Sequence, residues 1–193
     1  MTDRGALALD PAVRAVLRAA AGRRHPLVLV DGPSGAGKSS LAAALVEAWP
    51  GTAPEVVRVD EAIPGWRGLR RGAERLGTSL VAPHARRATG VVHRWDWLAD
   101  RAGAVARLRP GRALVIEGCG AFLAGRDRPD AVRVWVDAPY AERRRRALAR
   151  DRGAFDPHWE GWEADWRRYL GRLGPQRTRA LRVRLARLEP RGG

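Results

Sequence analysis

The chain has almost no cysteine and no long apolar run. Cys119 is the single cysteine among 193 residues, so no disulfide can form within the chain, and we expect a reducing, cytoplasmic setting. No apolar stretch approaches the roughly 18 residues that a membrane-spanning helix needs. The first residues also lack the basic-then-apolar pattern of a signal peptide. We therefore expect a cytoplasmic protein without a membrane partner, folded as a single domain over residues 1–193.

Lysine is almost absent as well. Lys38 is the only lysine, and every other member of the 36 basic residues is arginine. Such a chain keeps lysine where a compact, flexible point charge suits a phosphate. The net charge of +15 allows two interpretations, which are nucleic-acid binding or a general arginine bias with a site for a polyanionic nucleotide. Because the arginines are scattered from Arg4 to Arg191, the second is favoured, and a nucleic-acid partner stays the alternative.

A glycine-rich segment follows the first apolar run, residues 27–30, which reads as a buried strand. Residues 32–39, Gly-Pro-Ser-Gly-Ala-Gly-Lys-Ser, match the phosphate-binding loop pattern, and a helical run follows at once. Glycines let the backbone turn its N–H groups toward one point, and the helix adds the positive end of its dipole. Lys38 can reach the β- and γ-phosphates, and the Ser39 hydroxyl can hold Mg²⁺. The predicted ATP-binding residues of this loop are Gly32, Ser34, Gly35, Ala36, Gly37, Lys38, Ser39 and Ser40.

The remaining pattern alternates between strands and helices. Further strands are expected at residues 56–59, 113–116, 131–136 and 181–185, with a possible short strand from residue 91. For the segment 181–185, Leu188 keeps a helix as the alternative. Asp10 and Pro11 predict the start of a packing helix within residues 1–25. The arginine- and glycine-rich stretch 69–87 gives no clear pattern. The alternation predicts an α/β fold, a three-layer, doubly wound and mostly parallel sheet.

Three predicted strands end at an acidic residue: Asp60, Glu117 and Asp137. In open parallel sheets, ligands bind beyond the carboxyl ends of the strands, so Asp60 and Glu117 should lie near the phosphate-binding loop. We predict that Glu117 and Ser39 hold the metal and that Asp60 accepts the proton of a substrate hydroxyl. An arginine ion pair is the alternative for Glu117 and a turn is the alternative for Asp60. A turn is favoured for Asp137.

Residues 139–151 predict a helix crowded with arginine. Arg143, Arg146 and Arg150 fall on one helical face, which could clamp the migrating phosphoryl group if residues 139–170 form a lid. In this interpretation Arg143 contacts ATP, while Arg146 and Arg150 act in catalysis together with Lys38 and Asp60. The alternative is an exposed basic helix.

Tryptophans supply two further patterns. Trp66, Arg94, Trp95, Asp96 and Trp97 combine flat apolar faces with polar groups, a mixture that suits stacking and hydrogen bonding of a heterocycle or sugar. Of these, Trp66, Arg94, Trp95 and Asp96 are the predicted substrate-binding residues, and the alternative is that the tryptophans anchor the core or a loop. Trp159, Trp162 and Trp166 form a helical stripe that is expected to pack against the sheet.

Six segments, taken in the order in which they occur in the chain, resemble the uridine kinase-like P-loop kinases over about residues 26–170. The segments are the phosphate-binding loop, Val59-Asp-Glu61, Pro64-Gly-Trp-Arg-Gly-Leu69, Arg94-Trp-Asp-Trp97, Ile116-Glu-Gly118 and Arg143-x-x-Arg146-x-x-x-Arg150-Asp151. The resemblance implies a nucleoside kinase that uses MgATP. It places the catalytic base at Asp60, magnesium at Ser39 and Glu117, lid arginines at Arg143, Arg146 and Arg150, and an acceptor segment around Asp96.

The sequence departs from that family at two places. The family's Asp-x-Phe-Tyr acceptor motif reads Asp60-Glu-Ala-Ile63, so its aromatic contact is missing unless Trp66 substitutes, and the adenine-side segment is not recognisable in residues 179–190. We therefore expect an ATP-dependent phosphotransferase acting on a hydroxyl of a small acceptor, with a nucleoside favoured. The alternatives are a nucleoside monophosphate or other small-metabolite kinase, a nucleic-acid-associated P-loop ATPase, and a non-catalytic ATP-binding module.

Overall fold

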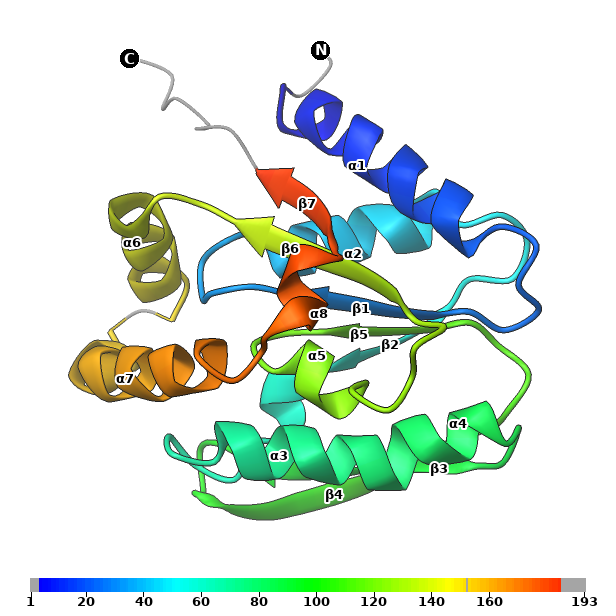
Figure 1. Cartoon of the computed structure of the whole chain (residues 1–193). Helices are drawn as coiled ribbons and strands as arrows, with labels where there is room; N and C mark the ends of the chain where they lie inside the picture. The colour runs from blue at the N-terminus through cyan, green and yellow to red at the C-terminus, as the bar shows by residue number, and fades with distance from the viewer. Residues whose placement is uncertain (1–3, 152, 185–193) are drawn as a thin grey trace.

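Five parallel strands form the centre of the molecule. The computed structural model describes residues 4–151 and 153–184. The strands lie in the order β2-β5-β1-β6-β7, and each pairs with its neighbours in parallel (Figure 1). Their bounds are Leu27–Asp31 for β1, Glu55–Arg58 for β2, Leu114–Glu117 for β5, Val132–Asp137 for β6 and Leu181–Arg184 for β7. The parallel arrangement brings every carboxyl end to the same edge of the sheet, as predicted.

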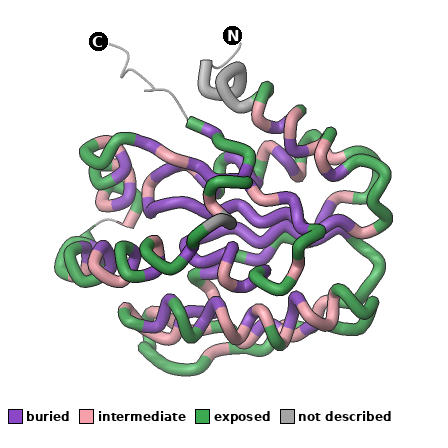
Figure 2. Tube along the Cα trace, in the orientation of Figure 1, coloured by how far each residue is buried: buried purple, intermediate pink, exposed green. Residues whose placement is uncertain are grey.

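Alternating side chains of the strands supply two separate cores. In β1, Leu27 and Leu29 belong to one apolar cluster, whereas Val28 and Val30 belong to the other, as the two-residue period of a strand requires. Helices α1 (Arg4–Ala20) and α2 (Lys38–Glu47) cover the valine face. The opposite face is covered by α3 (Leu69–Leu76), α5 (Ala121–Ala124) and α7 (Trp159–Leu170). The buried residues concentrate along the strands (Figure 2), and the three-layer, doubly wound prediction is confirmed.

A second, two-stranded sheet lies beneath the first in the view of Figure 1. Strand β3 (Gly90–Asp96) pairs antiparallel with β4 (Arg101–Leu108), and the register shifts between His93 and Trp95. The sequence predicted only the first of these strands. The β4 sequence Arg-Ala-Gly-Ala-Val-Ala-Arg-Leu holds few β-branched and no aromatic residues, so its strand is formed through pairing with β3 rather than through local propensity.

Two local predictions need correction. Helix α1 begins at Arg4 and continues through Pro11, so Asp10 does not start it. Its packing against the sheet through Val13 and Val16 outweighs the local signal. The stretch 69–87, which had no clear pattern, is helical and consists of α3, a π-helical turn η2 (Gly77–Val81) and α4 (Ala82–Ala85). Its buried residues recur at helical spacing, and they are Leu69, Ala73, Leu76 and Leu80.

The elements around the carboxyl edge complete the fold. Strand β2 ends at Arg58, and the short 3₁₀ helix η1 (Val59–Ala62) carries Asp60 instead of the strand itself. Helix α6 (Tyr140–Arg150), the 3₁₀ turn η3 (Asp156–His158) and α7 lie beyond the strands. The aromatic stripe of α7 is buried, as predicted. Among the described residues, no helix has the length and apolar character needed to cross a membrane.

Candidate active site

The phosphate-binding loop connects β1 to α2 and wraps around the side chain of Lys38. Gly35 and Gly37 have φ values of 76° and 98°, which glycine adopts without strain. A side chain at Gly35 would collide with the backbone carbonyl of Arg143, because α6 approaches the loop closely there. Lys38 as a residue is 8% exposed, and its ammonium donates to the Pro33 carbonyl at 2.8 Å. The loop thus has the compact shape in which backbone N–H groups can converge on a phosphate.

Ser39 and Glu117 meet beside the loop. The Ser39 hydroxyl donates to Glu117 Oε1 at 2.8 Å, joining the start of α2 to the end of β5. Burial raises the pKa of Glu117, and the nearby Asp60 raises it further, whereas Lys38, Ser39 and Arg58 act in the opposite direction. A hydroxyl and a carboxylate are hard oxygen ligands that suit Mg²⁺. The described residues contain no cluster of three His, Cys, Asp or Glu side chains able to hold a metal, so a magnesium ion here would share its coordination with phosphate oxygens and water, as it commonly does.

A cavity of about 560 Å³ opens next to this pair. Eleven of the predicted site residues line it, and Gly32 and Ala36 instead belong to the loop's backbone behind it. The predicted residues that line the cavity are Ser34, Gly35, Gly37, Lys38, Ser39, Ser40, Asp60, Trp66, Glu117, Arg146 and Arg150. The fold therefore brings segments from four separate parts of the sequence to one concave surface, the arrangement typical of a ligand site.

One end of the cavity has an aromatic wall. It is lined by Ile63, Trp66, Trp97, Phe155 and Trp162, close to Asp60. The Trp66 ring lies 4.8 Å from that of Trp97 and stacks on Phe155 at 5.2 Å between centroids. Trp97 also donates from Nε1 to the backbone carbonyl of Asp60 at 3.0 Å. The Trp66 ring also stacks on His158, with 4.1 Å between centroids. This wall, called the acceptor wall below, places apolar side chains close to Asp60.

Three predicted substrate-binding residues lie outside the cavity lining. Arg94 pairs with Glu61 at 3.2 Å. The Asp96 carboxylate accepts the N–H groups of Leu98 and Ala99 at the hairpin turn. Trp95 lies next to the register shift of β3 and is likewise absent from the lining. Within residues 94–97 only Trp97 lines the cavity.

The arginines of α6 have different surroundings. Arg146 and Arg150 line the cavity, where Arg146 pairs with Glu142 at 2.7 Å and Arg150 makes two 2.8 Å bonds to Asp151. The predicted ATP contact of Arg143 needs correction. Its guanidinium is buried and bonds both oxygens of Glu163 on α7, at 2.8 and 2.6 Å. Because both terminal nitrogens of the guanidinium bond Glu163, Arg143 holds α6 against α7 rather than facing the cavity.

Cys119 and Trp162 are among the residues that line the cavity but had no site role predicted from the sequence. Both contact Ser34 of the phosphate-binding loop. Burial raises the pKa of the Cys119 thiol, so the sulfur stays protonated. The aromatic stripe on α7 gave no indication that one of its members faces a cavity, because a helical stripe predicts burial but not the neighbour.

A buried carboxylate anchors the strand that leads into the loop. Asp31 accepts the N–H groups of Gly32, Gly120 and Phe122 and the hydroxyl of Tyr169. Burial raises the pKa of Asp31, and these hydrogen bonds lower it. The carboxylate thus ties β1, α5 and the end of α7 together directly behind the phosphate-binding loop.

Comparisons with known proteins address the fold. No protein-family model matches the chain, and no curated protein sequence does either. Among solved structures, a possible uridine kinase from Bacillus stearothermophilus superposes with a TM-score of 0.62 at 19% identity, covering 91% of this chain and 96% of the other. A candidate fructose transport system kinase from Silicibacter sp. TM1040 superposes with a TM-score of 0.51 at 22% identity, covering 90% and 95%. The chain therefore shares the α/β fold of these two structures.

Proposed function

We propose that this protein is an ATP-dependent kinase that transfers the γ-phosphoryl group of ATP to a hydroxyl of a small, nucleoside-like acceptor. One observation carries the proposal. The phosphate-binding loop, the Ser39–Glu117 pair and Asp60 border the same 560 Å³ cavity. Phosphoryl transfer needs these parts together, since it depends on positioning and charge stabilisation more than on covalent chemistry.

Each part has a defined role in the transfer. The loop N–H groups and the Lys38 ammonium bind the β- and γ-phosphates. Ser39 and Glu117 would hold Mg²⁺, which neutralises phosphate charge when it is bound. Asp60 accepts the hydroxyl proton of the acceptor as its oxygen forms a bond to the γ-phosphorus and the bond to the β-phosphate oxygen breaks, leaving ADP. Arg146 and Arg150 stabilise the negative charge on the transferred group.

The acceptor wall favours an acceptor without a phosphate group. Its half-buried rings, Trp66 and Trp97, offer apolar surface, which suits a heterocycle. The arginines that line the cavity, Arg146 and Arg150, are each held in an ion pair with a carboxylate. During transfer these two arginines exchange those carboxylates for the transferred group, and the described residues of the cavity lining include no further arginine for a second phosphate on the acceptor. A nucleoside is therefore favoured over a nucleoside monophosphate. The similar structure described as a possible uridine kinase also supports a nucleoside acceptor. The similar structure described as a fructose transport system kinase keeps a sugar as the second candidate.

An acceptor screen tests the proposal. ADP release from MgATP is measured with nucleosides, nucleoside 5′-monophosphates, sugars and polynucleotides, with the Lys38→Ala variant as the control for contaminating kinases. We expect a nucleoside to stimulate ADP release in the wild-type protein and not in the variant. Stimulation by polynucleotide alone would replace the kinase with a nucleic-acid-associated ATPase. Stimulation by a monophosphate but not by its nucleoside would overturn the assignment of the acceptor.

A further inference from the structure

Trp162 reaches the cavity from α7, and its indole N–H bonds to the phosphate-binding loop. The side chain is 5% exposed, and Nε1 donates to the Ser34 hydroxyl at 2.9 Å. An indole nitrogen can only donate a hydrogen bond, so the Ser34 oxygen is the acceptor. This contact joins two segments that lie 128 positions apart in the sequence, and it leaves the Ser34 hydrogen available for another acceptor.

The next hydrogen bond runs from Ser34 to Cys119. The Ser34 oxygen lies 3.5 Å from the Cys119 sulfur, and the sulfur lies 3.4 Å from the carbonyl oxygen of Gly32. A carbonyl oxygen only accepts, so the single thiol hydrogen is donated to Gly32, and the sulfur accepts a hydrogen bond from the Ser34 hydroxyl. The sulfur also accepts one from the Lys38 ammonium, at 3.7 Å. The thiol is buried, which keeps its proton in place for the bond to Gly32. The donors therefore follow one order, Trp162 to Ser34 to Cys119 to Gly32, and the last member belongs to the loop itself.

The ring of Trp162 also belongs to the acceptor wall. It stands edge-on to Trp66, with 6.5 Å between centroids and an interplanar angle of 90°, and edge-on to Phe155 at 6.2 Å and 77°. Edge-to-face contacts of this kind hold aromatic rings in defined orientations. One side chain thus packs with the surface expected to meet the acceptor and bonds the loop expected to meet the triphosphate.

We propose that Trp162 is a positioning residue. Through Ser34 and Cys119 it holds the phosphate-binding loop in the shape that binds the nucleotide phosphates, and it makes the loop and the acceptor wall one rigid unit. The inference rests on the proposed function in that the loop is taken to bind a nucleotide. It extends that function by giving a binding role to a residue that the sequence pattern assigned to the core.

The test is a double-mutant cycle read by MgADP binding in isothermal titration calorimetry, without any acceptor. Trp162→Phe keeps an aromatic ring and removes the N–H, whereas Ser34→Ala removes its acceptor. We expect each variant to weaken MgADP binding roughly three- to tenfold, the range that one hydrogen bond supports. The double variant should bind no more weakly than the weaker single one, because both changes break the same bond. Wild-type affinity in Trp162→Phe, or independent losses that add, would overturn the proposal.

Two controls separate positioning from general damage. Trp159→Phe removes an indole N–H from the same helix, but that group bonds the Tyr140 hydroxyl and the ring does not line the cavity, so MgADP affinity should stay at the wild-type value. At the next hydrogen bond of the series, Cys119→Ser keeps a donor and an acceptor, so this variant should bind MgADP more tightly than Cys119→Ala. Thermal unfolding of every variant verifies that each is folded. Equal affinity in the two Cys119 variants would remove the thiol from the chain of bonds.

The experiment distinguishes this proposal from the proposed function. A wild-type protein that binds MgADP but phosphorylates no acceptor would refute the kinase assignment, while the cycle would still decide the role of Trp162. Variants that bind MgADP like the wild type would refute the role of Trp162 and leave the kinase assignment standing. A wild-type protein that does not bind MgADP would overturn both.

Discussion

Arg143 on α6 and Glu163 on α7 form a two-fold hydrogen-bonded ion pair inside the protein, with side chains that are 10% and 2% exposed. The guanidinium also lies over the rings of Tyr140 and Trp159, at 4.8 and 5.7 Å from their centroids. Two helices that the sequence grouped as one lid region are thereby joined to each other. Whatever motion α6 makes therefore has to carry α7 with it or break a buried charge pair.

Removing one partner of that pair should be costly. Glu163→Gln leaves the Arg143 charge buried without a counter-charge, and we expect the free energy of unfolding to fall by about 3–5 kcal/mol. Urea denaturation followed by tryptophan fluorescence measures the loss. Glu160→Gln is the matched control, because Glu160 lies on the same helix and is exposed, and its effect should stay within about 0.5 kcal/mol. Equal midpoints for the two variants would show that the pair contributes no stability.

Glu117 should govern the magnesium requirement. Glu117→Gln keeps an oxygen for the Ser39 hydroxyl but removes the negative charge, so we expect the Mg²⁺ concentration for half-maximal ADP release to rise about 10- to 100-fold. The measurement is a magnesium titration at saturating ATP with the acceptor found in the screen. Glu61→Gln serves as the control, since Glu61 pairs with Arg94 and does not line the cavity. An unchanged magnesium requirement in Glu117→Gln would place the metal elsewhere.

Asp60 should affect turnover without affecting nucleotide binding. Asp60→Asn removes the proposed proton acceptor, and we expect kcat to fall about 10²- to 10⁴-fold while MgADP affinity hardly changes. Steady-state kinetics and calorimetry measure the two quantities. Asp127→Asn is the control, because its side chain is 89% exposed and its ion pair is with Arg126. Parallel loss of binding and turnover would remove Asp60 from the role of general base.

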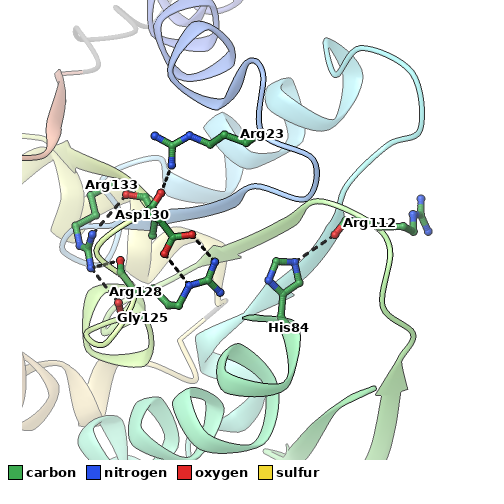
Figure 3. Close-up of polar contacts among 8 residues, drawn as sticks. Arg23, His84, Arg112, Gly125, Arg128, Asp130 and Arg133 are labelled. Atoms are coloured by element: carbon green, nitrogen blue, oxygen red, sulfur yellow. Dashed lines mark hydrogen bonds and ion pairs between the residues drawn. The ribbon is translucent and has the colours of Figure 1, made fainter. Parts of the chain in front are cut away.

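His84 should make stability depend on pH. At the amino ends of the strands, opposite the candidate active site, its Nε2 contacts the Arg112 carbonyl at 3.2 Å, and Arg128 lies nearby in a charged cluster with Asp130 (Figure 3). Burial lowers the pKa of His84, and the charges of Arg128 and His25 lower it further, while the Arg112 carbonyl and Asp130 oppose the shift. The folded protein therefore binds a proton less readily than the unfolded chain, whose histidine pKa is about 6.5.

The sign of the effect follows from linkage. Below about pH 6.5 the unfolded state takes up the proton first, so stability falls as the pH drops from about 6.5 toward the folded-state pKa. His84→Gln keeps a donor for the Arg112 carbonyl but does not titrate, and it should flatten this part of the profile. Urea midpoints at about pH 5.5 and about pH 7.5 measure the difference. The same slope in the wild type and the variant would show that His84 does not contribute.

The sequence predicted the α/β fold and the phosphate-binding loop because both are local properties. The loop depends on consecutive residues from Gly32 to Ser39, and β1 and β5 are visible as short apolar runs. Strand β4 was missed because its composition carries little β-propensity and its hydrogen bonds come from β3. The conformation of a segment can be predicted from its own sequence when its own residues determine it. It cannot be predicted in this way when, as for β4, pairing with another strand determines it.

The sequence by itself determined which residue types surround the site, namely one lysine in a glycine-rich loop, acids near the ends of strands, arginines on one helical face and tryptophans nearby. Tertiary structure alone decided which of them meet. It turned Arg143 to Glu163 and away from the cavity, placed Trp97 rather than Asp96 in the lining, and brought Trp162 to Ser34. The physical reason is that backbone conformation follows from neighbours along the chain, whereas a buried side chain takes its partner from whichever distant segment the packing of the core brings within reach.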